Sequence, residues 1–186
     1  GFIESAKTEA IENILEACSY KQQNPELKVI VTGCLAERYR SQIEEEIPEV
    51  DAVVGCASNK AIDTIVARLF HGENHLESYG AKKDFPLGGK RVIGTPAHYA
   101  YLKIAEGCNN RCHYCAIPGI RGPLRSRDMA DCVAEARWLA GEGVKELIIV
   151  AQDPTAYGED WGKPGSICEL LDQLNKVQGI EWIRIM

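Results

Sequence analysis

The sequence predicts an α/β protein whose strands pair in parallel sheets. Short β-branched or apolar runs recur along the chain, and segments with helical spacing of apolar residues stand between them. This alternation favours parallel strands, because each parallel connection must cross the sheet and commonly does so as a helix. A long Gly- and Pro-rich interval divides the alternation into two series. We therefore expect two domains, at residues 1–72 and 99–186, with a linker at 73–98.

The first series predicts a small parallel sheet. Apolar residues recur at helical spacing between Ala6 and Cys18, and Asn24-Pro25 marks the end of that helix near residue 23. Next come an expected strand at 28–32, a helix at 35–47, a strand at 51–56 and a helix at 59–70. From residue 71 to residue 98 the period disappears, so no regular structure is expected there.

The second series predicts three strands and two helices. In chain order they are a strand at 99–105, a helix at 128–141, a strand at 145–151, a helix at 166–177 and a strand at 181–186. The longest loops, 106–127 and 152–165, follow the first two strands. In parallel sheets and barrels sites are built at this edge. Because the chain stops on an uncovered strand, we expect it to be cut off inside a larger domain.

Composition excludes several classes of protein. The chain has 186 residues, a formal charge of −6 and 45% hydrophobic residues, as ordinary globular proteins do. No apolar run approaches the roughly 18–20 residues that span a bilayer, so neither a membrane segment nor a secretory signal is expected. The mild acidity argues against holding nucleic acid by bulk charge.

The eight cysteines do not resemble a disulfide framework. Five are scattered, whereas Cys108, Cys112 and Cys115 share one short loop. This pattern favours a reducing, cytoplasmic compartment. We expect the scattered Cys18, Cys56, Cys132 and Cys168 to be packing residues.

The C-x3-C-x2-C spacing of Cys108, Cys112 and Cys115 points to a metal centre with an open position. A closed zinc site needs four protein ligands, and a four-iron cluster has four irons to fill. Three thiolates would leave one position for a substrate, which is typical of catalytic metal sites. The alternative is a zinc knuckle completed by His98 or His113.

The three-cysteine motif, just after a strand and with Tyr114 before the last cysteine, resembles that of the radical S-adenosylmethionine (SAM) enzymes. The resemblance implies a 4Fe-4S cluster on Cys108, Cys112 and Cys115, whose fourth iron chelates SAM. One electron then cleaves SAM to methionine and a 5'-deoxyadenosyl radical, which abstracts hydrogen from an unactivated carbon. It also implies that residues 99–186 are the first part of a truncated partial (β/α)6 barrel. No acid–base catalytic residue is assigned.

The flanking residues resemble the methylthiotransferase branch of that family. They read KIAEGC up to Cys108, AIPGIRG from Ala116, and Arg125-Ser-Arg127. Gly33-Cys34-Leu-Ala is similar to the site of the third cysteine of the amino-terminal domain in that branch, which holds a second, auxiliary 4Fe-4S cluster on three cysteines. The implied full-length protein therefore carries two clusters.

The opening GFIESAK, Ala151-Gln-Asp153 and Tyr157-Gly158 look most like members that modify an aspartate of a small-subunit ribosomal protein. The implied partners are that ribosomal protein and an electron donor such as flavodoxin or ferredoxin, with no membrane. Two alternatives are a tRNA adenosine methylthiotransferase and a non-catalytic metal-binding module. Since the other auxiliary cysteines would precede Gly1, we expect the fragment alone to be inactive.

The resemblance also implies contacts with SAM. Tyr114 would lie near its adenine, and Gln152, next to Asp153, near its amino group. For Asp153 the alternative is a local turn. The basic residues of the long loop could hold a carboxylate or a macromolecular substrate, or could form structural ion pairs; they are Arg111, Arg121, Arg125 and Arg127.

Overall fold

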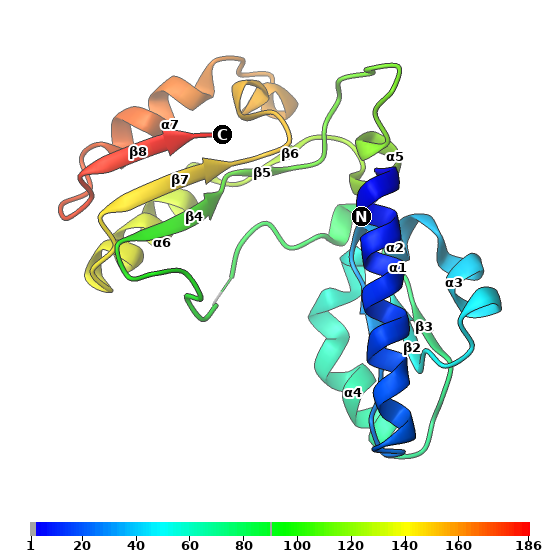
Figure 1. Cartoon of the computed structure of the whole chain (residues 1–186). Helices are drawn as coiled ribbons and strands as arrows, with labels where there is room; N and C mark the ends of the chain where they lie inside the picture. Colours follow the sequence, from blue (N-terminus) through cyan, green and yellow to red (C-terminus); the bar gives the residue numbers. More distant parts are fainter. Residues whose placement is uncertain (1–2, 90) are drawn as a thin grey trace. The chain divides into compact units, whose positions relative to one another are not determined.

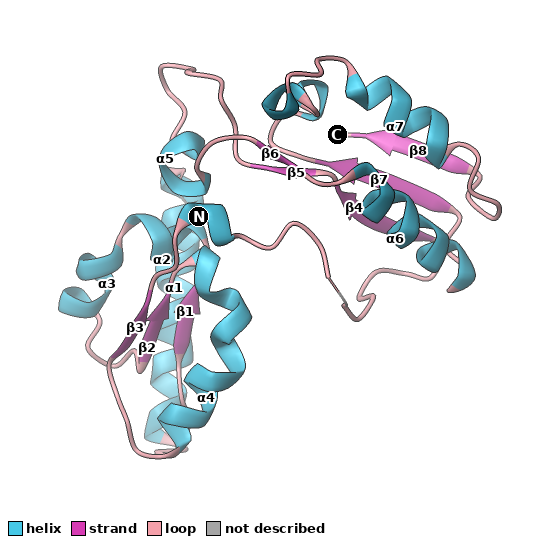
Figure 2. Cartoon of the chain, turned by 180° about the vertical axis from the view of Figure 1, so that it is seen from behind, coloured by secondary structure: helices cyan, strands magenta, loops and turns pink. Residues whose placement is uncertain are grey.

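The computed structural model describes residues 3–89 and 91–186. The chain divides into two compact units, Gly1–Phe85 and Pro86–Met186. Each unit is an α/β structure with a three-stranded parallel sheet (Figures 1 and 2). The predicted fold class is therefore confirmed. No helix within the described residues is long and apolar enough to cross a membrane.

The first unit has its strands in the order β1-β2-β3, with Thr32 of β1 opposite Val54 of β2 and Val54 opposite Ser78 of β3. The strands are β1 (Ile30–Thr32), β2 (Ala52–Val54) and β3 (Leu76–Ser78). The helices are α1 (Glu4–Ser19), α2 (Cys34–Arg38), α3 (Arg40–Glu46) and α4 (Ile62–Phe70). Short 3-10 helices lie at Tyr20–Gln22, Cys56–Ala61 and Lys82–Asp84.

Helices cover both faces of this sheet (Figure 2). Val31 and Val53 pack on one face with residues of α1, α2 and α3. Ala52 and Val54 point to the other face, with Ile65 and Leu69 of α4. All three residues of β2 are buried, because successive side chains of a strand point to opposite faces.

Two expectations for this part of the chain are wrong. The helix expected at 35–47 is interrupted at Tyr39, whose backbone leaves the helical region (φ −116°, ψ 34°). Leu76–Ser78, expected to lie in an irregular linker, forms β3. Only Leu76 of β3 is buried, since the strand is at the edge of the sheet, and one apolar residue produces no periodic signal.

The buried carboxylate of Asp51 anchors the sheet of the first unit. Its Oδ2 accepts the backbone N–H of Val29 at 2.7 Å and lies 2.6 Å from the Lys21 Nζ, and its Oδ1 lies 3.6 Å from the Lys28 Nζ. Burial alone would raise the pKa of Asp51, but the bonds from Lys21 and Val29 outweigh it and hold the pKa below its usual range.

The second unit has strands in the order β4-β7-β8, with Tyr101 of β4 opposite Ile148 of β7 and Ile148 opposite Arg184 of β8. The strands are β4 (Tyr99–Lys103), β7 (Glu146–Val150) and β8 (Trp182–Ile185). Helix α6 (Met129–Gly141) begins after Asp128, whose side chain accepts the N–H of Asp131, and α7 (Ser166–Leu174) begins after Gly165. Short 3-10 helices lie at Pro154–Ala156 and Glu159–Trp161.

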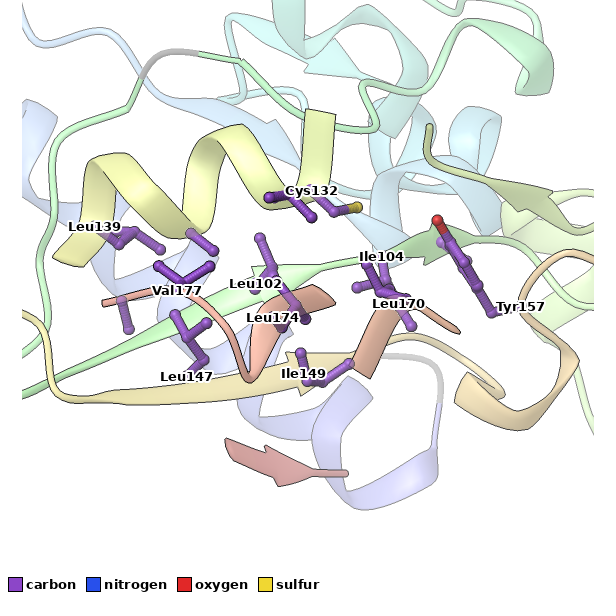
Figure 3. Close-up of a cluster of buried hydrophobic side chains, with 14 of the residues drawn as sticks. Leu102, Ile104, Cys132, Leu139, Leu147, Ile149, Tyr157, Leu170, Leu174 and Val177 are labelled. Carbon is purple, nitrogen blue, oxygen red and sulfur yellow. The ribbon is translucent and has the colours of Figure 1, made fainter. Parts of the chain in front are cut away.

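Both α6 and α7 cover the same face of this sheet. Leu102 of β4 and Ile149 of β7 are fully buried in one cluster with side chains of both helices (Figure 3), including Cys132, Leu139, Leu170 and Leu174. The opposite face carries Tyr101, which is 41% exposed, and Trp182, 63% exposed. The strands follow one another in sequential order, and both helices lie on one side of the sheet. This arrangement is that of a barrel wall rather than of a doubly wound sheet.

Side chains cap the outer edge of β4. The His98 carbonyl accepts the backbone N–H groups of Lys145 and Glu146, at the start of β7. Because the carbonyls of successive strand residues alternate in direction, those of residues 99, 101 and 103 point away from β7. Each accepts a side-chain bond: Tyr99 from the Thr95 hydroxyl at 2.6 Å, Tyr101 from Arg91, and Lys103 from Arg127 at 3.4 Å. Edge capping of this kind prevents further strand addition, so the sheet is closed on the β4 side.

We predict that Asp51→Asn destabilises the first unit at pH 7 by about 1–2 kcal/mol, because a charged hydrogen-bond acceptor is lost from a buried site. The folded pKa of Asp51 is lowered. Its stabilisation is therefore complete above the unfolded value of about 3.9 and disappears as the pH falls through the folded pKa. Urea unfolding followed by circular dichroism should show that the free energies of unfolding of the two proteins converge as the pH falls. The exposed substitution Glu26→Gln is the control; a difference that persists below pH 2 would contradict the assignment.

Candidate functional site

A two-residue antiparallel ribbon closes the base of the cysteine loop, residues 107–124. Its strands are β5 (Ala105–Glu106) and β6 (Arg125–Ser126), with Ala105 opposite Ser126. The Cys108 N–H donates to the Gly122 carbonyl at 3.1 Å, which continues the ribbon by one step. The loop therefore leaves the carboxyl end of β4 with both of its ends fixed (Figure 1). Within it, Ile117–Arg121 forms the short helix α5, where the sequence predicted only loop.

Gly107 makes this closure sterically possible. Its φ is +76°, a value that residues with a side chain rarely adopt. A Cβ placed there would lie 2.1 Å from the Pro123 carbonyl oxygen and 2.6 Å from that of Gly122. Only glycine lets the two ends of the loop approach so closely directly before the first cysteine.

A buried carboxylate, Glu106, neutralises two cations at the loop base. The residue is 1% exposed. Its Oε2 lies 2.8 Å from the Lys103 Nζ, and both of its oxygens lie 3.2 Å from the Arg121 Nη1. Arg121 comes from α5, on the far side of the three cysteines. This ion pair therefore joins the two ends of the loop across the thiols.

The three thiols share this loop but do not form a ready-made metal site. Cys108 and Cys115 are half-buried, Cys112 is exposed, and none forms a disulfide. The Cys115 N–H donates to the Cys112 carbonyl at 3.0 Å, so a turn links the last two. Across residues 3–89 and 91–186, no three or more Cys, His, Asp or Glu side chains are arranged to hold a metal ion. Their role as ligands stays a prediction.

A hydrogen bond joins the loop after β7 to the cysteine loop. The Asn110 Nδ2, two residues after Cys108, donates to the Asp153 Oδ2 at 2.7 Å. The other oxygen of Asp153 accepts the hydroxyl and N–H of Thr155, at 2.6 Å and 3.1 Å. The bond from the Thr155 hydroxyl, with those from Asn110 and the backbone, lowers the pKa of Asp153. Asp153 thus forms the local turn considered as its alternative, and it also joins the two loops.

The residues expected to contact SAM lie at the solvent-facing side of these loops. Tyr114 is 91% exposed, and Gln152, directly before Asp153, is also exposed. Neither is packed in the core, so both side chains are accessible to a ligand. Their assignment to SAM stays a prediction.

Two of the four arginines in the basic loop form structural ion pairs. Arg121 pairs with Glu106, and buried Arg127 pairs with Glu135, which also binds the Arg91 Nη2 at 2.9 Å. The carbonyl of Arg127 accepts the hydroxyl of buried Tyr157 at 2.7 Å. For these arginines the ion-pair alternative is therefore correct, while Arg111 is exposed.

The scattered cysteines differ in their roles. Cys18, Cys56 and Cys132 are buried, as predicted for packing residues. Burial raises the pKa of Cys132 to about 12, so its thiol stays protonated. Cys168 is exposed on α7, and the expectation that it packs in the core is wrong. The helical period of α7 places Leu170 and Leu174 inward instead.

Cys34 is the first residue of α2 in the first unit, directly after Gly33, whose φ is +100°. It is half-buried and packs against a small buried cluster of Cys56, Ala57 and Phe85. The turn at the carboxyl end of β1 therefore places this thiol at the edge of the sheet, and its role as a cluster ligand stays a prediction.

The sequence analysis missed Glu106, Asn109 and Asn110. The Asn109 Oδ1 accepts the Leu124 N–H at 3.0 Å and so holds the end of the loop. A carboxylate and two amides within four residues of Cys108 were a visible signal, but Arg121, Asp153 and Leu124, to which they bond, lie 15 or more residues away. Only the folded chain identifies those partners.

The donor set fits an iron–sulfur cluster. Three cysteine thiols, rather than a mixture with His or carboxylate, occupy one loop that is fixed at its base and reachable from solvent. Soft thiolate ligands of this kind favour iron–sulfur clusters and zinc. The residues that would hold a cluster are Cys108, Cys112 and Cys115.

Comparisons with known proteins match both units. Residues 102–185 match the radical SAM superfamily, and residues 1–55 match the uncharacterized protein family UPF0004. Similar curated relatives are named ribosomal protein uS12 methylthiotransferase RimO, including those of Acetivibrio thermocellus (49% identical) and Clostridium tetani (48%). Each match covers all of this chain and 42% of the relative, so the chain spans less than half the length of these proteins.

We predict that Gly107→Ala disrupts the cysteine loop without unfolding the second unit. The added methyl group would meet two carbonyl oxygens, and the positive φ costs a further ~1–2 kcal/mol. Hydrogen exchange should increase at residues 107–124 while the core strands stay protected. Gly119→Ala is the control, since nothing lies within 4 Å of a Cβ there. Unchanged exchange in the Gly107 variant would contradict the predicted steric role.

We predict that Asn110→Ala separates the cysteine loop from the loop after β7. Among the described residues, the substitution removes the bond to Asp153, which is exposed to solvent and is therefore worth about 0.5–1 kcal/mol. Hydrogen exchange should quicken in peptides covering residues 107–116 and 152–156 together. Arg111→Ala, an exposed neighbour, should leave both peptides unchanged. An effect confined to one of the two loops would show that the bond does not couple them.

Proposed function

Because the chain belongs to the radical SAM superfamily through residues 102–185 and to family UPF0004 through residues 1–55, we propose that it is part of a radical SAM methylthiotransferase. The proposed reaction of the whole protein adds a methylthio group to an aspartate of a small-subunit ribosomal protein. The names of the relatives at 43–49% identity, ribosomal protein uS12 methylthiotransferases, support this substrate over tRNA adenosine.

The observation that carries the proposal is the cysteine loop. Three thiols stand on one loop at the carboxyl end of the first strand of a barrel-type sheet, with the loop base fixed by Gly107 and Glu106. In barrels this end of the sheet is where active sites lie. A 4Fe-4S cluster bound there would supply one electron to SAM, with one iron left open for it.

In this proposal the residues of the chain bind the cluster and orient SAM. Cys108, Cys112 and Cys115 are the cluster ligands. Asn110 holds their loop against Asp153, so the backbone at Gln152 stays beside it. We assign Tyr114 to the adenine of SAM and Gln152 to its amino group. The exposure of both supports access by the cofactor.

Cys34 is proposed as one ligand of an auxiliary 4Fe-4S cluster in the whole protein. Its place at the carboxyl end of β1, half-buried, supports this role. A single thiol cannot hold a cluster, so we propose that further ligands of the whole protein complete this one. We therefore propose that these residues alone are inactive. We place the reaction in the cytoplasm, with flavodoxin or ferredoxin as the reductant.

We predict that the full-length protein, reconstituted anaerobically with iron and sulfide and then reduced, gives an electron paramagnetic resonance signal that shifts on adding SAM. Cys112→Ala should abolish the shift, because that thiol is one of three ligands next to the open iron. Cys168→Ala, an exposed thiol elsewhere, should retain it. Stoichiometric zinc with no response to SAM would instead favour the non-catalytic metal-binding module.

The substrate is tested with the same reconstituted protein, SAM and a reductant. A methylthio mass gain on an aspartate of small-subunit ribosomal protein is the expected result. The same gain on tRNA adenosine, with the ribosomal protein unchanged, would overturn the proposed substrate and leave the enzyme class intact.

A further inference from the structure

Two cysteines of the first unit follow neighbouring strands at equivalent positions. Strands β1 and β2 are parallel, with Thr32 opposite Val54. Cys34 lies two residues beyond Thr32, and Cys56 lies two residues beyond Val54. Adjacent strands are about 4.8 Å apart. The chain therefore reaches residues 34 and 56 from the same edge of the sheet, at the ends of two neighbouring strands.

Glu37 fixes the face of α2 that is turned toward Cys56. Cys34 and Glu37 are three residues apart on that helix and share one face. The Glu37 Oε2 accepts the Cys56 N–H at 3.1 Å. The backbone comes so close here that a Cβ on Gly55 would lie 2.4 Å from the same oxygen. The face of α2 that carries Cys34 therefore borders the backbone of Cys56.

Packing places both side chains in one apolar cluster. Cys56 is 4% exposed and forms this cluster with Ala57 and Phe85, and half-buried Cys34 packs against it. Both side chains are present as thiols. The pair thus combines one thiol that a reagent can reach with one that is shielded, which suits sequential thiol–disulfide exchange.

We propose that Cys34 and Cys56 form a reversible disulfide when Cys34 carries no metal. Cys34 packs against the cluster that contains Cys56, and the strands leading to the two residues are about 4.8 Å apart, which is within the Cα separation of about 4.4–6.8 Å that a disulfide requires. The inference rests on the proposed function only where it treats Cys34 as a cluster ligand. The disulfide would store that thiol in an oxidised form and exclude the auxiliary cluster until it is reduced.

The oxidant is a small-molecule disulfide. The Cys34 thiolate attacks one of its sulfurs, forms a mixed disulfide and releases one small thiol. The Cys56 thiolate then attacks the Cys34 sulfur and releases the second small thiol. In total, two protein thiols become one disulfide, one small-molecule disulfide becomes two thiols, and a dithiol reductant reverses the exchange.

The test uses the full-length protein after iron is removed with a chelator. It is treated with oxidised glutathione, alkylated, and digested with trypsin without reduction. Cleavage after Lys28, Arg38, Arg40 and Lys60 gives peptides 29–38 and 41–60, each with one of the two cysteines. Mass spectrometry should find these peptides linked, and a reducing agent should separate them.

Matched variants make the outcome specific. Cys56→Ser should leave Cys34 glutathionylated or alkylated with no link, whereas Cys168→Ser should leave the link intact. Reconstitution with iron and sulfide before oxidation should prevent the link in the unmodified protein. Peptides 29–38 and 41–60 recovered separately, or Cys34 linked to another cysteine, would overturn the proposal. A link that forms equally after reconstitution with iron and sulfide would overturn only the role of Cys34 as a ligand.

Discussion

The candidate site depends on the buried carboxylate of Glu106. Its two cationic partners, Lys103 and Arg121, come from β4 and from α5, which stand before and after the three cysteines. At 1% exposure, an unpartnered carboxylate would be strongly destabilising, so the fold tolerates Glu106 only while both ends of the loop are present. The ion pairs thereby make closure of the loop a condition of folding in this region. Gly107 then supplies the backbone conformation that this closure needs.

The position of the loop follows from the way the sheet is covered. Because α6 and α7 both pack on one face, the opposite face of β4 and β7 stays available to line the inside of a barrel. The outer edge of β4 is capped by Thr95, Arg91 and Arg127, which defines β4 as the first strand. The cysteine loop thus begins at the end of the first strand and lies beside the loop of the second.

Sequence reasoning predicted those features that a local pattern encodes. Runs such as ELIIV in β7 and the apolar spacing of α4 are local signals, and the C-x3-C-x2-C spacing placed three thiols in one loop. Strand β3 has one buried residue and leaves no such signal. The bond from Asn110 to Asp153 joins residues 43 positions apart, and Glu106 finds Arg121 only through the fold. Such partners depend on tertiary packing, so no period or motif predicts them.

The fixed base of the cysteine loop has a physical consequence for its three thiols. Converging thiolates repel one another, so gathering three of them needs a compensating attraction. Glu106, Gly107 and Asn110 instead restrain the backbone, which lowers the conformational entropy that remains to be lost when ligands gather. The proposed cluster would contribute the remaining free energy on binding, as metal ions do in small metal-dependent folds. A loop restrained at its base therefore has less conformational entropy to lose at its three thiols than an unrestrained loop of the same length.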